Sequence, residues 1–167
     1  MGEHLEKWNR EHIFPLSKGG FYKIDLDDVF DGKEMYWNTN SLRHGMSDAH
    51  ALSAVDTREN SRRNNLLYGQ YNGPKGTLGK FKGDVARSVF YMAVQYNGLE
   101  IVNGSPEGVL GQLGDSKTLL RWRRNDPPDD FEMNRNNIIY TWQINRNPFI
   151  DQPELIEYVW GNRVGQV

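Results

Sequence analysis

The sequence predicts an α+β fold, in which a single, mostly helical domain carries a small β-hairpin near its N-terminus. Three observations lead to this prediction. Residues 7–14 have the character of a short extended strand, and they run into a proline. Apolar side chains recur at helical spacing after Asp56 and again in later segments up to residue 160. The length of 167 residues corresponds to about one domain, which is enough to bury a hydrophobic core.

The bulk composition excludes several classes of protein. Hydrophobic residues make up 37% of the chain and aromatic residues 12%, which indicates a globular rather than a disordered protein. No apolar run approaches the roughly 20 residues of a membrane helix, and the N-terminus lacks the apolar core of a signal peptide. Cysteine is absent, so disulfides and thiolate metal sites are excluded. A net charge of −2 leaves nucleic-acid contacts to local basic clusters.

The first part of the chain is expected to form the hairpin and a helix behind it. Residues 16–46 are rich in Gly, Asn and Asp and predict a long irregular loop, of the kind that is usually functional. Residues 47–54 then return as the second strand. Asp56 is suited to cap a helix that continues over residues 58–67.

The rest of the chain is expected to be helical. The glycine-rich stretch 69–82 predicts a connector, because it lacks the lysine–threonine pair and the preceding strand of a phosphate-binding loop. Asp84 is predicted to cap a central, buried helix. A loop at 103–106 precedes a further helix over residues 116–124.

Two helices are predicted to complete the domain. The stretch 126–130 contains two prolines and three aspartates, which are favoured in the first turn of a helix, and this helix is expected to continue toward Asn145. A last helix is predicted over residues 154–160. The helical spacing of four aromatic residues favours core packing over stacking on bases: Trp122, Tyr140, Trp142 and Trp160.

Glu11, His12 and Asn60 are the residues that most directly indicate a chemistry. A carboxylate beside a histidine, with a distant asparagine near a helix start, supplies what a one-metal phosphodiesterase needs. The asparagine oxygen is a hard, neutral ligand that suits Mg²⁺. Each residue also has an ordinary interpretation, since neighbouring side chains on a strand point to opposite faces and an asparagine often caps a helix. A zinc site with His12, His44 and His50 is an alternative, although no short histidine spacing supports it.

The chain resembles the bacterial endonuclease I family, whose members carry a ββα-metal (His-Me finger) active site and cleave DNA, often also RNA, with little sequence preference. The similarity extends in family order from residue 8 to about 160. It is carried by Asn9-Arg10-Glu11-His12-Ile13-Phe14-Pro15, Ser47-Asp48-Ala49-His50, Glu59-Asn60-Ser61-Arg62-Arg63-Asn64-Asn65, Gly83-Asp84-Val85-Ala86-Arg87, Phe90-Tyr91-Met92, Asp126-Pro127-Pro128-Asp129, Arg135-Asn136-Asn137 and Gln143-Ile144-Asn145-Arg146-Asn147-Pro148-Phe149.

The resemblance implies a ββα-metal motif over about residues 7–67 and a helical remainder over 83–160, within one domain spanning 1–167. It implies that His12 is the general base and that Glu11 and Asn60 hold one Mg²⁺, for which Mn²⁺ or Ca²⁺ can substitute. The products are then a 5′-phosphate and a 3′-hydroxyl.

The resemblance also assigns roles to arginine residues and a setting to the protein. Arg63 is expected to contact phosphate, and Arg43 is the candidate for an arginine that stabilises the cleaved phosphate. The implied substrate is DNA or RNA, and the protein is expected to be monomeric, away from membranes, and secreted or periplasmic. Further residues are predicted to bind nucleic acid: Arg10, Arg62, Lys80, Lys82 and Arg87.

Two departures from the family keep a rival hypothesis open. Ala51 stands where the family has an asparagine that steadies the hairpin, and only ten residues precede Glu11. These features favour a catalytically weak or inactive relative that binds nucleic acid through its basic clusters.

Overall fold

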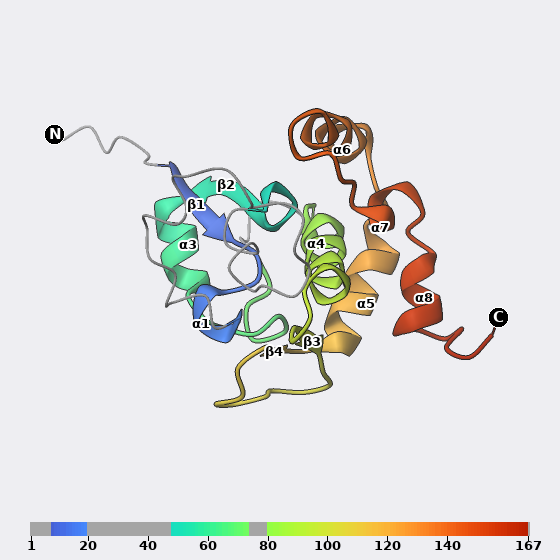
Figure 1. The fold of residues 1–167 in the computed structure, drawn as a ribbon. Coiled ribbons are helices and arrows are strands. Elements are labelled where there is room, and N and C mark those ends of the chain that lie inside the picture. The colour runs from blue at the N-terminus through green and yellow to red at the C-terminus, as the bar shows by residue number, and fades with distance from the viewer. Residues whose placement is uncertain (1–7, 20–47, 74–79, 167) are drawn as a thin grey trace, which may run out of the picture.

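The computed structural model describes residues 8–19, 48–73 and 80–166 and confirms the predicted α+β class. The elements are, in chain order, β1 (Trp8–His12), α1 (Leu16–Gly19), η3 (Ala49–Ala51), β2 (Leu52–Asp56), α3 (Thr57–Arg63), α4 (Lys82–Gln95), β3 (Glu100–Ile101), β4 (Gln112–Leu113), α5 (Ser116–Asn125), α6 (Asp130–Gln143), α7 (Pro148–Asp151) and α8 (Leu155–Val159). Figure 1 shows a small hairpin, β1 and β2, on one side of the molecule with α3 beside it, and the helices α4 to α8 on the other side.

The hairpin pairs β1 with β2 in antiparallel register, so that Trp8 lies opposite Asp56 and His12 opposite Leu52. The predicted first strand is confirmed. The second strand begins later than the predicted residue 47, because the Asp48 side chain accepts a hydrogen bond from the His50 N–H (2.9 Å) and closes the short helix η3 first. α3 follows β2 directly, since Asp56 accepts hydrogen bonds from two N–H groups of its first turn, as predicted. The helix ends at Arg63, so its predicted extension to residue 67 is wrong.

The loop predicted over residues 16–46 is wrong at its start, where α1 forms a short helix. Residues 20–46 lie outside the described residues. β3 and β4, which the sequence did not indicate, form a two-stranded parallel pair. Each contributes two residues, too few for a period-2 pattern to be visible.

α4 is the central helix of the core (Figure 1), as predicted, and Val89, Phe90 and Met92 are completely buried. The helix begins at Lys82 and not at Asp84, which lies in its first turn and does not cap it. A Cβ at Gly83 would lie 1.9 Å from the Asp126 carbonyl oxygen. The start of α4 therefore packs directly on the backbone between α5 and α6.

α5 and α6 begin at aspartate caps. Asp115 accepts a hydrogen bond from the N–H of Thr118, and Asp129 accepts one from Glu132. The two prolines before Asp129 lie outside α6, so the prediction that they occupy its first turn is wrong. α6 ends at Gln143, and the connection predicted to follow it contains α7, whose first residue is a proline. α8 is shorter than the predicted 154–160.

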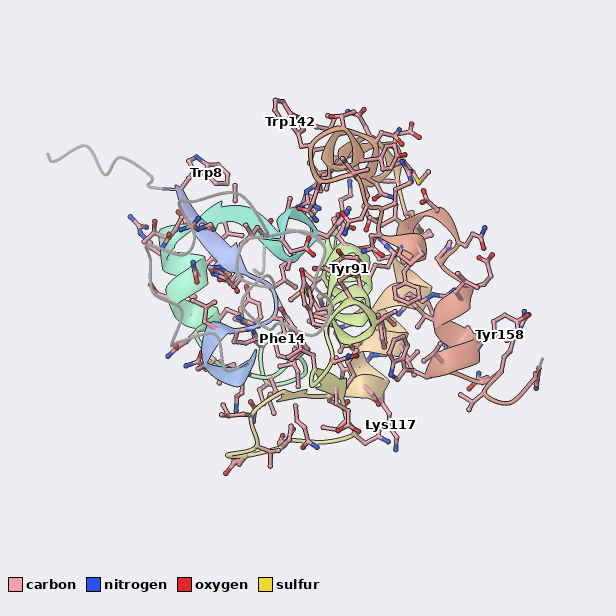
Figure 2. All side chains as sticks on the ribbon, viewed as in Figure 1. Trp8, Phe14, Tyr91, Lys117, Trp142 and Tyr158 are labelled. Atoms are coloured by element: carbon pink, nitrogen blue, oxygen red, sulfur yellow. The ribbon has the colours of Figure 1, made fainter. Side chains whose placement is uncertain are left out.

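The aromatic residues divide into two groups. Trp122 is buried, and Trp160 packs on Phe90 with ring centroids 4.7 Å apart. Trp142, by contrast, is 81% exposed, and Figure 2 shows it projecting outward from α6. Tyr140 is also exposed, so the prediction of core packing is wrong for these two residues. Within the three described ranges, no helix has the length and apolar character needed to cross a membrane.

Glu157 of α8 joins the last helix to α5. Its carboxylate accepts hydrogen bonds from Arg123 (2.8 Å) and Arg124 (2.8 and 2.7 Å). The Arg124 hydrogen bonds lower the pKa of Glu157 to about 2, from an ordinary value of 4.5. The ion pairs therefore stabilise the fold above pH 4.5, and this contribution is lost as the pH falls toward the folded-state pKa.

We predict that Glu157→Gln lowers the free energy of unfolding at neutral pH by roughly 1–2 kcal/mol, since charged hydrogen bonds at a partly screened site are lost. The difference from the unsubstituted protein is expected to shrink as the pH falls from 4.5 to about 2. Urea unfolding across this pH range measures it, with the exposed neighbour Glu154→Gln as control. A difference that does not vary with pH would contradict the assignment.

Candidate active site

Asn60 of α3, one of the two predicted metal ligands, lies next to the end of β1, which carries the other, Glu11. Glu11 and His12 are the last two residues of β1, and Asn60 lies on the helix that packs against this strand. The Asn60 amide nitrogen donates a hydrogen bond to the carbonyl oxygen of Arg10 (3.3 Å), the residue before Glu11. Among the described residues, the Asn60 amide oxygen has no hydrogen-bond partner, so this hard oxygen remains available beside the strand.

Glu11 is held by Arg63 of α3, whose terminal nitrogen lies 2.9 Å from Glu11 Oε1. The Glu11 side chain is only 12% exposed. Burial raises the pKa of this carboxyl, and the Arg63 guanidinium opposes the rise by favouring the ionised form. Among the described residues, Oε2 has no partner, so the carboxylate is oriented through one oxygen and keeps the other.

Arg63 itself is buried and bonded to protein atoms. It donates to the carbonyl oxygens of His12 (3.2 Å) and Ile13 (2.8 Å) and to the Tyr68 hydroxyl (3.1 Å). The predicted contact between Arg63 and phosphate remains a prediction, and the observed contacts direct the guanidinium toward the end of β1.

His12 is half-buried at the end of the hairpin, opposite Leu52. The Leu52 carbonyl accepts a hydrogen bond from Arg135 of α6 (2.7 Å), and Arg135 also donates to the carbonyl of Ala49. Arg135 therefore supports β2 next to Ala51, at the position where the family asparagine is missing.

A second contact near Asn60 was not anticipated from the sequence. The Tyr71 hydroxyl donates to Glu59 Oε1 (2.6 Å), and Arg62 lies 3.4 Å from the other Glu59 oxygen. Burial, together with Glu59, raises the pKa of Tyr71, so the hydroxyl stays protonated and serves as a donor. No local pattern links Tyr71 to Glu59, because the intervening chain leaves the helix and returns.

Asp48, for which the sequence predicted no role, and His50, which was considered only as a ligand of the alternative zinc site, both lie in the interior. Asp48 Oδ2 accepts hydrogen bonds from the hydroxyls of Tyr91 (2.6 Å) and Tyr96 (2.7 Å), and Oδ1 accepts one from Gln143 (2.7 Å). Burial lowers the pKa of His50, whose Nε2 lies 3.3 Å from the Asn145 carbonyl oxygen. Tyr91 appears at the centre of the molecule in Figure 2.

The donor chemistry at β1 and α3 fits a hard cation. Glu11 and Asn60 offer one carboxylate and one amide oxygen, the few protein ligands that Mg²⁺ takes while it keeps several waters. Within residues 8–19, 48–73 and 80–166, no three histidine, aspartate or glutamate side chains group together as a metal site. His50 faces the interior and His44 lies outside the described residues, so the structure offers no support for the zinc alternative.

The residues predicted to bind nucleic acid differ in their exposure to solvent. Arg10, Arg62 and Lys80 are exposed, and Lys82 lies 5.3 Å from the centre of the Trp122 ring. Arg43 lies outside the described residues.

Arg87 does not belong with them, because it is completely buried. It donates hydrogen bonds to both oxygens of Glu132 (2.8 and 2.5 Å) and to the carbonyl of Asp126 (2.7 Å). The prediction that Arg87 binds nucleic acid is therefore wrong: this guanidinium joins α4 to α6.

Comparison with known proteins agrees with the residue pattern. The family model described as Endonuclease I matches residues 77–154. An extracellular ribonuclease of Bacillus subtilis is 34% identical over an alignment that covers 95% of this chain and 56% of that protein. The chain belongs to the endonuclease I family.

More distant relatives include an endonuclease-1 of Buchnera aphidicola and an extracellular deoxyribonuclease of Aeromonas hydrophila. Each is 24% identical; the alignments cover 84% of this chain and 58% of the first protein, and 90% of this chain and 69% of the second. An extracellular ribonuclease of Bacillus amyloliquefaciens is also 34% identical, and the chain spans 56% of the length of each of the two Bacillus proteins. The candidate residues of β1 and α3 precede the segment that the family model matches.

We predict that Asp48→Ala lowers the free energy of unfolding by about 3 kcal/mol or more, because several buried donors lose their acceptor. Thermal or urea unfolding measures the change. The exposed Asp130→Ala is the control, and its effect is expected to stay within about 0.5 kcal/mol. An Asp48→Ala protein as stable as this control would show that the buried network contributes little.

Proposed function

We propose that this chain is a Mg²⁺-dependent endonuclease that hydrolyses phosphodiester bonds of DNA and RNA with little sequence specificity. The observation that carries the proposal is the hydrogen bond from Asn60 of α3 to Arg10, which directly precedes Glu11 and His12 on β1. Within the part of the chain that the structure describes, Glu11 Oε2 and the Asn60 amide oxygen have no hydrogen-bond partner. Family membership supports the reaction class, and relatives named as extracellular nucleases support secretion as the setting.

The residues have distinct roles in this proposal. Glu11 and Asn60 hold the metal ion, which when bound polarises the phosphate and stabilises the charge that develops on it. His12, in its neutral form, takes a proton from the attacking water. The water oxygen forms a bond to phosphorus as the bond between phosphorus and the 3′ oxygen breaks. The 3′ oxygen takes up a proton from solvent, which gives a 5′-phosphate and a 3′-hydroxyl.

Exposed arginine residues on the hairpin and on α3 support binding without base selection. Arg10 projects from β1 and Arg62 from α3, and both elements carry the proposed ligands. Guanidinium groups grip phosphate and thereby position the strand without reading its sequence.

We expect the protein to cut supercoiled plasmid and single-stranded RNA in Mg²⁺ and to stop when EDTA is added. His12→Ala is expected to slow cleavage by about 10²–10⁴-fold, the usual contribution of general-base catalysis. Asn60→Ala is expected to require more Mg²⁺, whereas Asn65→Ala, an exposed neighbour, serves as control. Direct religation of the cut DNA tests for 5′-phosphate ends.

Folded protein that retards nucleic acid but leaves it intact in Mg²⁺ would refute the enzyme and favour the binding relative. Cleavage that survives both EDTA and His12→Ala would refute the roles of the metal and of His12.

We further predict that Arg62→Met lowers the magnitude of the slope of log affinity against log salt concentration by roughly 0.7–0.9, the loss of one phosphate contact. Fluorescence anisotropy with a labelled oligonucleotide in EDTA measures the slope without cleavage. Arg163→Met is the control: Arg163 contacts Tyr158, which Figure 2 shows on the side of the molecule opposite Trp8. Equal slopes for both variants would exclude Arg62 from the binding surface.

A further inference from the structure

We propose that Arg63 is a positioning residue that holds Glu11 and the main chain at His12, and that it does not contact phosphate. The inference rests on the proposed function, because it concerns the metal ligand and the general base named there. It replaces the role that family resemblance assigned to Arg63.

The terminal nitrogens of Arg63 are already occupied by protein oxygens. Glu11 Oε1, the His12 and Ile13 carbonyl oxygens and the Tyr68 hydroxyl all lie 2.8–3.2 Å from them. The fifth N–H of the guanidinium, on Nε, is buried and has no hydrogen-bond partner among the described residues. Since the side chain is only 5% exposed, a phosphate could reach it only by displacing these contacts.

The contacts of Arg63 explain how Glu11 and His12 can serve one site. Their side chains leave the strand on opposite sides, so no single face of β1 presents both. Arg63 holds the side-chain carboxylate of Glu11 and the main-chain carbonyl of His12 at the same time. Asn60 and Arg63 are three residues apart on α3 and so face β1 together, which fixes the two proposed ligands relative to each other.

Tyr68 holds Arg63 in turn. Its hydroxyl accepts a hydrogen bond from Arg63 and donates one to the Ile13 carbonyl (2.6 Å). Its ring packs edge-on against Trp122 of α5, with centroids 5.5 Å apart. The position of Glu11 is thus tied through two buried side chains to the helical core.

The role can be tested by Mn²⁺ binding to the protein without nucleic acid, measured by calorimetry or electron paramagnetic resonance. Arg63→Lys keeps the charge but cannot reach four oxygens at once. It is expected to weaken Mn²⁺ binding about 10-fold or more, as the loss of a ligand's supporting partner usually does. With saturating metal, KM for nucleic acid is expected to change less than about twofold. Arg163→Lys is the matched control.

A folded Arg63→Lys protein with unchanged Mn²⁺ affinity would overturn the inference. If its KM for nucleic acid were raised as well, the earlier hypothesis that Arg63 contacts phosphate would be supported. If this variant does not fold, Tyr68→Phe decides. That protein is expected to bind Mn²⁺ about threefold more weakly or worse, and unchanged affinity would again overturn the inference. If the unsubstituted protein neither binds Mn²⁺ nor cleaves nucleic acid, the proposed function itself fails.

Discussion

The buried carboxylate of Asp48 is the contact on which the arrangement of the other segments depends. It joins η3 to the hydroxyls of Tyr91 in α4 and of Tyr96, the residue that follows α4, and to the amide of Gln143 at the end of α6. A buried carboxylate is costly unless every lone pair is satisfied, so the three segments can meet in few other ways. Because β2 starts at Leu52, four residues beyond Asp48, this network also determines where the hairpin emerges from the core.

Apolar packing forms the helical core of this molecule, and polar contacts connect its segments. The helices bury Phe90, Met92 and Leu119 in one apolar core, to which Ile13 and Phe14 after β1 also contribute. The joints between segments are made by buried charged groups, among them Arg63 between α3 and β1 and Arg87 between α4 and α6. The chemistry we propose is located at one of these joints, where side-chain geometry is set by hydrogen bonds and not by packing alone.

Local signals in the sequence were sufficient for the hairpin, for α3 with its Asp56 cap, and for the long helices, because periodicity and capping act over short distances. They also indicated Glu11 and Asn60 as metal ligands. Glu11 belongs to β1, and the structure places Asn60 next to this strand. The environment of a charged side chain depends on residues far along the chain. Arg87 therefore seemed a surface residue, although Glu132 pairs with it in the interior. The same reason hid the partners of Glu59 and Asp48, and Trp142 shows that helical spacing alone does not bury an aromatic ring.

Among the described residues, β1 and β2 form a two-stranded sheet, and Trp8, Arg10 and Ser53 on it are exposed to solvent. Two-stranded hairpins are marginally stable alone, and regions that bury little apolar surface open at a lower free energy than the core does. On warming, β1 and β2 are therefore expected to separate before α4 and its neighbours unfold. We therefore expect the first opening on warming to be local and reversible, because it leaves a folded scaffold on which the strands can pair again.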